Sequence, residues 1–317
     1  PLSRRTNMGF SSGCSVNYGW QLNNDLTSLT NNFVGSNLDL TYGFNNVHQI
    51  TSQTFSDDTY SWHPDSAATV VYDPASSTNQ YPQVGGVPFL YSANGCLTSD
   101  GIWTHGYDTQ DQLLLSSKAG VSLAFVYDPF QRQAEKSATI SGTAKTRYIY
   151  SGWQRLADYD SVTDTLQNRY VYGTGLDEPL IQVSNTGVLT FLHANHQGSI
   201  VATSDGSGVV ANKNTFGPFG ETSNLGGTTF GYTAQRFDSE TGLYYYKNRQ
   251  YSPSLGRFLQ PDFVGGRLYT YANNDPLQFV DSLGLEPEPS FANLKGLIEH
   301  SADPGAELPF GCRSGTN

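Results

Sequence analysis

The sequence predicts an all-β protein built from antiparallel hairpins that lie side by side. The chain has 20 Tyr and 17 Phe beside a single Met, and it combines 33 Gly with a charged fraction of only 14%. Aromatic residues suit a half-buried pleated surface, and glycine suits the turns between strands. In addition, a short phrase of alternating aromatic residues followed by turn residues recurs along the chain. The length of 317 residues allows one large β domain or two ordinary ones.

Each copy of the recurrent phrase predicts one strand and one turn. The copies lie at 107–113, 127–132, 147–152, 169–173 and 243–247. Tyrosines two positions apart project to one face of a strand, and the Asp, Asn or Gly that follows lets the chain reverse. Because a single hairpin is only marginally stable in water, neighbouring units must pair to bury their aromatic faces. The phrase therefore predicts a winding sheet, with an ordinary tyrosine-rich β-sandwich as the alternative.

Charge and hydropathy argue against two classes of partner. The formal net charge is −11 and the sequence pI is about 4.8, so the phosphates of a nucleic acid would be repelled. No window approaches the roughly 18 consecutive apolar residues that a membrane-spanning helix needs. Residues 1–30 lack the basic, apolar and small-residue regions that follow one another in a signal peptide. Because the sequence starts at Pro1 and not at Met, we expect a fragment or a processed product.

Metal, cofactor and nucleophile motifs are weak in this sequence. The three cysteines, Cys14, Cys96 and Cys312, form no CxxC pair and predict neither a disulfide framework nor a metal site. His193 and His196 would project to opposite faces of a strand, so we expect a structural role for them. The segment 9–13 fits G-x-S-x-G but lacks the flanking strand and helix of a nucleophile elbow. We therefore expect no metal and no cofactor.

Five longer phrases carry a resemblance to a known family. They lie at 79–101, 172–180, 192–208, 230–262 and 271–285, and together they resemble Rhs (YD-repeat) proteins. The resemblance implies a β-sheet strip that spirals into a hollow shell around a C-terminal polypeptide, often a toxin, in secreted or cell-surface bacterial polymorphic toxins. Complete shells use more hairpins than this chain can supply. We therefore expect the closing turns of such a shell, or a smaller open or partial one.

The resemblance also divides the chain. Residues 1–229 are expected to form the YD-repeat sheet, 230–285 the Rhs-associated core, and 286–317 a short C-terminal tail. The tail opens with the proline-rich segment 286–289, which stops sheet pairing, and its spacing predicts one short helix over 291–300. The expected partners are the chain's own C-terminal polypeptide or a toxin cargo, and the remaining shell or a second copy at the sheet edges.

Two Asp-x-x-Gly loops are the best candidates for chemistry. They begin at Asp262 and Asp281, and in each the closing Gly supplies the freedom for a positive φ that holds the carboxylate at a rigid corner. Two carboxylates brought close cannot both ionise easily, so one keeps a proton and the pair can work as acid and base. In the family that this chain resembles, these loops belong to an intramolecular aspartic protease that cuts after the Leu closing the second loop.

The resemblance therefore implies Asp262 and Asp281 as a catalytic pair and Leu285–Glu286 as the scissile bond of a single-turnover, self-cleaving aspartic endopeptidase. Arg257 lies five residues before Asp262 and could support a carboxylate or an oxyanion, or serve only in packing. The family usually has Pro after each aspartate, whereas this chain has Phe263 and Ser282. A non-catalytic structural shell or surface interaction module is the alternative, and a hydrolase acting on an external substrate is a third.

Overall fold

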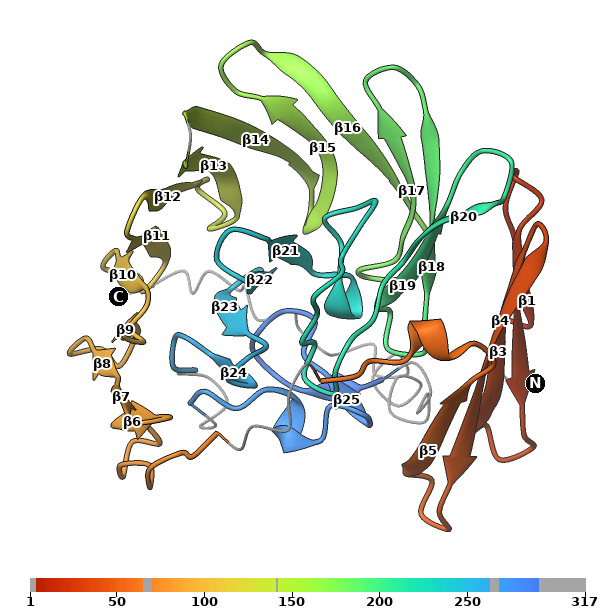
Figure 1. Ribbon diagram of the computed structural model, residues 1–317, viewed down its shortest axis with the longest axis horizontal. Helices are drawn as coiled ribbons and strands as arrows, with labels where there is room; N and C mark the ends of the chain where they lie inside the picture. The colour runs from red at the N-terminus through yellow and green to blue at the C-terminus, as the bar shows by residue number, and fades with distance from the viewer. Residues whose placement is uncertain (1–3, 65–69, 141, 263–267, 291–317) are drawn as a thin grey trace, which may run out of the picture.

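A long antiparallel wall of hairpins is the largest sheet of the molecule (Figure 1). The computed structural model describes residues 4–64, 70–140, 142–262 and 268–290. Thirteen strands follow one another in chain order, each paired with the next: β8 (Leu90–Tyr91), β9 (Leu97–Ser99), β10 (Thr104–Tyr107), β11 (Leu113–Lys118), β12 (Val121–Tyr127), β13 (Gln133–Thr139), β14 (Thr143–Ser151), β15 (Gln154–Asp160), β16 (Thr165–Tyr172), β17 (Pro179–Ser184), β18 (Leu189–Ala194), β19 (Ile200–Ser204) and β20 (Val210–Lys213). The predicted hairpin array is thus confirmed.

A second antiparallel sheet continues the curve beside β20 (Figure 1). Its strands are β1 (Asn7–Gly9), β2 (Ser15–Trp20), β3 (Leu26–Phe33), β4 (Ser36–Phe44) and β5 (Ile50–Phe55). The Val34 N–H donates to the Gly208 carbonyl at 2.9 Å, and the core of this sheet includes Val201 and Ala202 of β19. The two sheets therefore share buried apolar surface although their hydrogen-bond ladders are separate.

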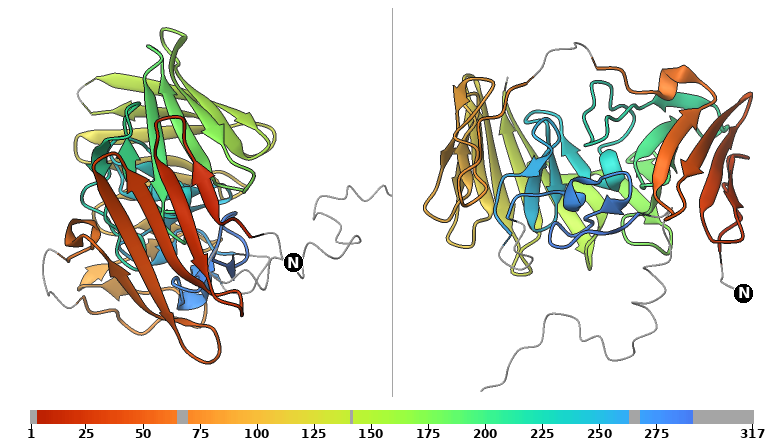
Figure 2. Two further views of the ribbon diagram at one scale, coloured as in Figure 1. Left: turned by 90° about the vertical axis from the view of Figure 1, so that its right-hand side faces the viewer. Right: turned by 90° about the horizontal axis from the view of Figure 1, so that it is seen from below.

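A four-stranded sheet lies inside the curve, as Figure 2 also shows. It consists of β21 (Arg236–Asp238), β22 (Leu243–Tyr246), β23 (Arg249–Ser252) and β24 (Arg257–Phe258). We call it the inner sheet. The phrase at 243–247 thus belongs to the inner sheet and not to the wall. Every residue of β22 and β23 is buried, which is the pattern of strands covered on both faces.

Short elements complete the described part of the chain. Strand β6 (Gln83–Val84) pairs with β7 (Val87–Pro88), and β25 (Phe279–Val280) pairs with β26 (Glu288–Pro289). The helical elements among the described residues are the 3₁₀ turns η1 (Asp58–Tyr60), η2 (Tyr232–Ala234) and η3 (Ala272–Asn274). In the same residues no helix has the length and apolarity needed to cross a membrane. The predicted helix over 291–300 lies outside the described residues.

The aspartate of the recurrent phrase caps its hairpin turn. The Asp128 carboxylate accepts hydrogen bonds from the backbone N–H groups of Phe130 and Arg132 at 2.9 and 3.0 Å, and the Asp128 N–H donates to the Arg132 carbonyl at 2.9 Å. Asp108 and Asp205 make the same pattern of contacts. A short side chain that accepts two backbone donors closes a tight turn without help from other elements. This explains the acid that follows the tyrosine at Tyr107-Asp108 and Tyr127-Asp128.

The tyrosine of the phrase connects one hairpin to the previous one. At the end of β12, the Tyr127 hydroxyl donates to the carbonyl of Leu113, the first residue after the preceding turn, at 3.1 Å. We call such a contact a tyrosine rung. Three more rungs join Tyr107 to Leu97, Tyr150 to Gln133 and Tyr172 to Arg155, at 2.7 to 2.9 Å. The ring therefore packs on the inner face while the hydroxyl finds a partner, as a buried tyrosine requires.

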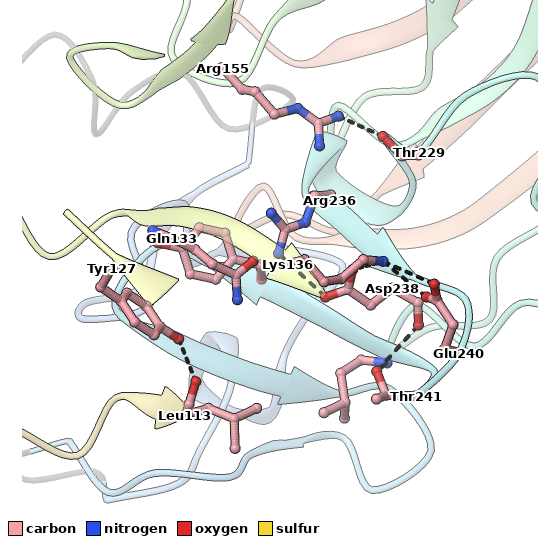
Figure 3. Close-up of polar contacts among 12 residues, drawn as sticks. Leu113, Tyr127, Gln133, Lys136, Arg155, Thr229, Arg236, Asp238, Glu240 and Thr241 are labelled. Atoms are coloured by element: carbon pink, nitrogen blue, oxygen red, sulfur yellow. Dashed lines mark hydrogen bonds and ion pairs between the residues drawn. The ribbon is translucent and has the colours of Figure 1, made fainter. Parts of the chain in front are cut away.

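Polar contacts attach the inner sheet to the wall (Figure 3). The Lys136 ammonium of β13 lies 2.9 Å from the Asp238 carboxylate of β21 and 3.0 Å from that of Glu240. From β15, the Arg155 guanidinium donates to the Thr229 hydroxyl at 2.5 Å. The rest of the inner sheet packs around a cluster of buried aromatic residues: Tyr232, Tyr244, Tyr246, Tyr251, Phe258 and Tyr271. This packing fixes the inner sheet rigidly, and the candidate site is built on it.

Candidate functional site

The second Asp-x-x-Gly loop is a tight turn that only glycine can close. It follows β25, and the Gly284 N–H donates to the Asp281 carbonyl at 3.3 Å. Gly284 has a φ of +68°, and a Cβ added there would lie 2.7 Å from the Tyr246 carbonyl oxygen. Backbone in this left-handed conformation and at this distance excludes a side chain. The Leu285 N–H then donates to the Asp281 carboxylate at 2.8 Å, so the backbone at the predicted scissile bond contacts the predicted catalytic acid.

One arginine brings the two predicted aspartates together. From β23, Nη2 of Arg249 lies 3.2 Å from the Asp262 carboxylate and 3.3 Å from the Asp281 carboxylate. The same guanidinium donates to the carbonyls of Leu268 at 3.1 Å and Gly284 at 2.5 Å. Only 4% of Asp262 and none of Asp281 is exposed to solvent. Two buried carboxylates thus share one buried cation, as buried charges require.

The pKa values in this group reflect burial first and charge second. Burial raises the pKa of Asp281 above its usual value, while the Arg249 guanidinium opposes that rise and the nearby Asp262 charge adds to it. Burial also lowers the pKa of Arg249, against the influence of both carboxylates. The charged forms of Asp281 and Arg249 are therefore stabilised mainly by the opposite charges beside them, and either charge would be unfavourable at this buried position without its partner.

Arg257 has other partners than the aspartates. Its guanidinium donates to the carbonyl and side-chain oxygens of Asn79 at 2.9 and 2.7 Å, and it lies 4.3 Å from the centre of the Tyr81 ring. Arg257 thus holds the segment before β6 against the inner sheet. The place that we considered for Arg257 is taken by Arg249, which sequence analysis missed. The available signal was an arginine shortly after the tyrosine-rich strand Leu243–Tyr246, because a charge buried there needs an acidic partner.

A small cavity opens beside this group. It has a volume of about 180 Å³ and is lined by Asp262, Arg249 and Leu285 together with wall residues that include Gln112 and Tyr127. A cavity with polar walls and this volume can hold several waters. Asp262 lines the cavity, whereas Asp281 is not among its lining residues. Residues 263–265 of the first loop, including Phe263, lie outside the described residues.

The two histidines and the segment 9–13 have contacts that fit a role in packing. His193 lies 2.8 Å from the Ser204 hydroxyl, and the His196 ring packs edge-on against Tyr42 at 4.7 Å. Burial lowers the pKa of His193 to about 4 and that of His196 to about 3, which keeps both rings neutral. Within the described ranges no group of three or more His, Cys, Asp or Glu could hold a metal ion. The segment 9–13 turns into strand β2 and not into a helix.

The cysteines that the structure describes are isolated. Cys14 and Cys96 are both buried and unpaired, and the Cys14 thiol contacts the Gly208 carbonyl at 3.3 Å. Burial raises the pKa of Cys96 to about 12, so this thiol is a poor nucleophile. Cys312 lies outside the described residues.

Comparison with known proteins gives the family. A model described as the teneurin YD-shell matches residues 14–314. The tRNA3(Ser)-specific nuclease WapA of Bacillus spizizenii is 31% identical over 242 residues, which is 68% of this chain and 10% of that protein. The probable deoxyribonuclease RhsA of Dickeya dadantii is 28% identical over 236 residues, 68% of this chain and 16% of that protein. This chain thus spans only a small part of the length of these relatives.

Solved structures show the same fold. A crystal structure of TcdB2-TccC3-Cdc42 aligns with a TM-score of 0.65 at 17% identity, covering 89% of this chain and 19% of that one. A crystal structure of TcdB2-TccC3 without its hypervariable C-terminal region also gives a TM-score of 0.65, at 16% identity, with the same coverage of both chains. The family model covers nearly the whole chain, and the fold agrees with it. The chain therefore belongs to the teneurin YD-shell family of Rhs/YD-repeat proteins.

Proposed function

We propose that this chain is the closing part of an Rhs-type encapsulation module that cuts its own backbone after Leu285, with Asp262 and Asp281 as the catalytic pair. The observation that carries the proposal is the hydrogen bond of 2.8 Å from the Leu285 N–H to the Asp281 carboxylate. Substrate backbone and candidate catalyst are already in contact within one chain. Such proximity replaces a binding step and can supply much of the rate of a single-turnover reaction.

The names of relatives support a toxin or its fragment as the enclosed partner. WapA is named as a nuclease, and a 27% identical relative from Burkholderia cenocepacia is named a double-stranded DNA deaminase toxin. We propose that this chain encloses its own C-terminal polypeptide or a toxin cargo, and that it acts outside the producing cell or at its surface. The wall ends at β8 on one side, whereas the β1–β5 sheet lies beside β20 on the other, so we propose that the edge at β8 pairs with further shell or with a second copy.

The proposed reaction is a hydrolysis in which the two acids have separate roles. Water from the cavity gives a proton to Asp262 while its oxygen bonds to the carbonyl carbon of Leu285. The bond from that carbon to the Glu286 nitrogen then breaks, and Asp281 supplies the proton that the leaving amine takes. Two observations support this division: Asp262 lines the cavity, and burial raises the pKa of Asp281, which favours a retained proton.

A second candidate is a silent structural shell, and Arg249 is the observation that favours it. A cation within 3.3 Å of both carboxylates stabilises both as anions, whereas an aspartic-peptidase pair shares a proton. In this candidate the same three charges fasten the loop after β25 to the inner sheet. The replacement of the family's usual prolines by Phe263 and Ser282 also favours it.

Intact-mass measurement of the full chain distinguishes the two candidates. We expect freshly expressed wild type to separate into residues 1–285 and 286–317, and we expect Asp262→Asn and Asp281→Asn to remain whole, because Asn keeps the shape but cannot exchange the proton. Asp25→Asn is the control: it removes a buried carboxylate that is paired with His48 in the β1–β5 sheet, away from the site, and should leave cleavage intact. A wild type that stays full length over days would establish the silent shell instead.

A further inference from the structure

Three consecutive residues, two in the β22–β23 turn and the first of β23, hold three consecutive carbonyls of the loop that precedes the proposed cleavage point. We call this arrangement the carbonyl clamp. Its hydrogen bonds run in register, from side-chain nitrogen to backbone oxygen: Lys247 to Ser282 at 2.7 Å, Asn248 to Leu283 at 2.8 Å and Arg249 to Gly284 at 2.5 Å. Each of the three peptide planes from Ser282 to Leu285 is therefore held by side chains of the inner sheet.

Lys247 also connects the clamp to the wall. Its ammonium lies 2.6 Å from the Asp177 carboxylate and 3.0 Å from the side-chain oxygen of Gln235. With the Ser282 carbonyl, these partners use all three N–H donors of the ammonium. Asp177 belongs to the loop between β16 and β17, 70 residues before Lys247 in the chain. The Lys247 Nζ thus contacts the wall through Asp177, the segment before β21 through Gln235, and the loop that precedes the proposed cleavage point through Ser282.

The charge pair is needed for this contact to persist. The Lys247 side chain is 6% exposed and that of Asp177 is 15% exposed, so neither charge can be compensated by bulk water. A buried ammonium without its carboxylate is strongly unfavourable and would leave for solvent. Release of Lys247 would then free the Ser282 carbonyl and loosen the loop at its first peptide plane.

We infer that Lys247 and Asn248 are positioning residues for self-cleavage, and that Asp177 makes their action depend on docking of the β16–β17 loop against the inner sheet. This inference rests on the proposed function. Cleavage then requires a formed wall, because the lysine that holds the loop is itself held by the wall. A chain whose β16–β17 hairpin has not docked keeps its C-terminal segment attached.

The test follows the fraction of cleaved full chain over time by intact mass, in wild type and in a set of variants. Lys247→Met and Asp177→Asn should slow cleavage by about 100-fold, the loss expected when a reacting group is displaced by about 1 Å. Lys247→Arg keeps charge and donors and should restore most of the rate. Lys145→Met, which removes a largely exposed lysine of the wall, is the control and should cleave at the wild-type rate.

Two further readouts separate positioning from folding. The rate of Lys247→Met should fall by the same factor at every pH, because the titrating pair is unchanged, and hydrogen exchange at the Leu285 amide should become faster while the wall amides stay protected. If Lys247→Met does not fold, Asn248→Ala carries the test with an expected loss of about 10-fold, since one neutral hydrogen bond is removed. Wild-type cleavage with unchanged rates in these variants would overturn this inference alone. An uncleaved wild type would overturn the proposed function, and this inference with it.

Discussion

Replacing Gly284 by alanine should damage the candidate site far more than the same change at another glycine with a similar backbone. Gly284 and Gly242 have φ values of +68° and +73°. A Cβ at Gly242 would meet nothing within 4 Å, whereas one at Gly284 would lie 2.7 Å from the Tyr246 carbonyl oxygen. The left-handed conformation costs alanine about 1 kcal/mol at both positions. The difference between the two variants therefore isolates the contact with Tyr246.

The size of that difference can be worked from the geometry. The contact at Gly284 is about 0.7 Å closer than the 3.4 Å at which ordinary contact begins, and a backbone oxygen cannot rotate away. The loop must therefore move by a similar amount, which breaks the hydrogen bonds from Arg249 to Gly284 and from Leu285 to Asp281. Each bond contributes about 1 kcal/mol. Gly284→Ala should cost about 3 kcal/mol in unfolding free energy and slow any self-cleavage by about 100-fold, against about 1 kcal/mol and an unchanged rate for Gly242→Ala.

Urea unfolding measures the loss of unfolding free energy when both variants also carry Asp262→Asn, because this substitution should prevent self-cleavage during the measurement. Intact-mass time courses without that substitution measure the rate. Equal losses of stability at Gly284 and Gly242 would refute the reasoning, because they would mean that the Tyr246 carbonyl does not confine the loop. A stability difference without a rate difference would instead show that the loop tolerates displacement.

Two more predictions concern the buried charges. Because burial raises the pKa of Asp281 in the folded state above its usual 3.8, the folded chain binds this proton more tightly; the resulting stability is complete below that value and is lost as pH rises through the folded pKa. The test measures the free energy of unfolding in urea from pH 3 to 7 for Asp262→Asn and for the double variant that also carries Asp281→Asn. As the pH rises, the single variant should lose stability relative to the double variant. A difference that stays constant with pH would contradict this. Lys136→Met should cost about 3 kcal/mol, because Asp238 and Glu240 lose their shared cation. Lys145→Met, which removes a side chain that is 44% exposed, should change stability by no more than about 0.5 kcal/mol in the same unfolding assay.

The local features of the fold could be predicted from the sequence, because each depends on residues close in the chain. The turn at Asp128 needs only its own carboxylate and the next four residues, and the corner at Asp281 needs only a glycine three positions later. The all-β class follows in the same way, since strand and turn residues alternate along the wall.

The placement of the inner sheet and of Arg249 could not be predicted in this way. Arg249 reaches Asp281 across 32 residues, and that contact depends on how β23 packs inside the wall. Distance along the chain favoured Arg257, yet Arg257 on β24 contacts Asn79 instead. The sequence of β22, with Leu243 followed by three tyrosines, does not alternate, and this lack of alternation was the available sign of a strand covered on both faces.

The tyrosine rungs determine how a wall of this kind can change in length. Each rung joins a hairpin only to the one before it, so the four consecutive hairpins that begin with β10, β12, β14 and β16 each carry their own connecting tyrosine. Through these rungs each hairpin is stabilised by its nearest neighbour, as in a linear repeat array, while contacts such as Lys136–Asp238 add the attachment to the inner sheet. A whole hairpin can be gained or lost with its rung and turn cap while the remaining connections stay intact, whereas loss of a single strand would leave a phenol without an acceptor. The wall is therefore modular in units of two strands, and unfolding should begin at its free ends.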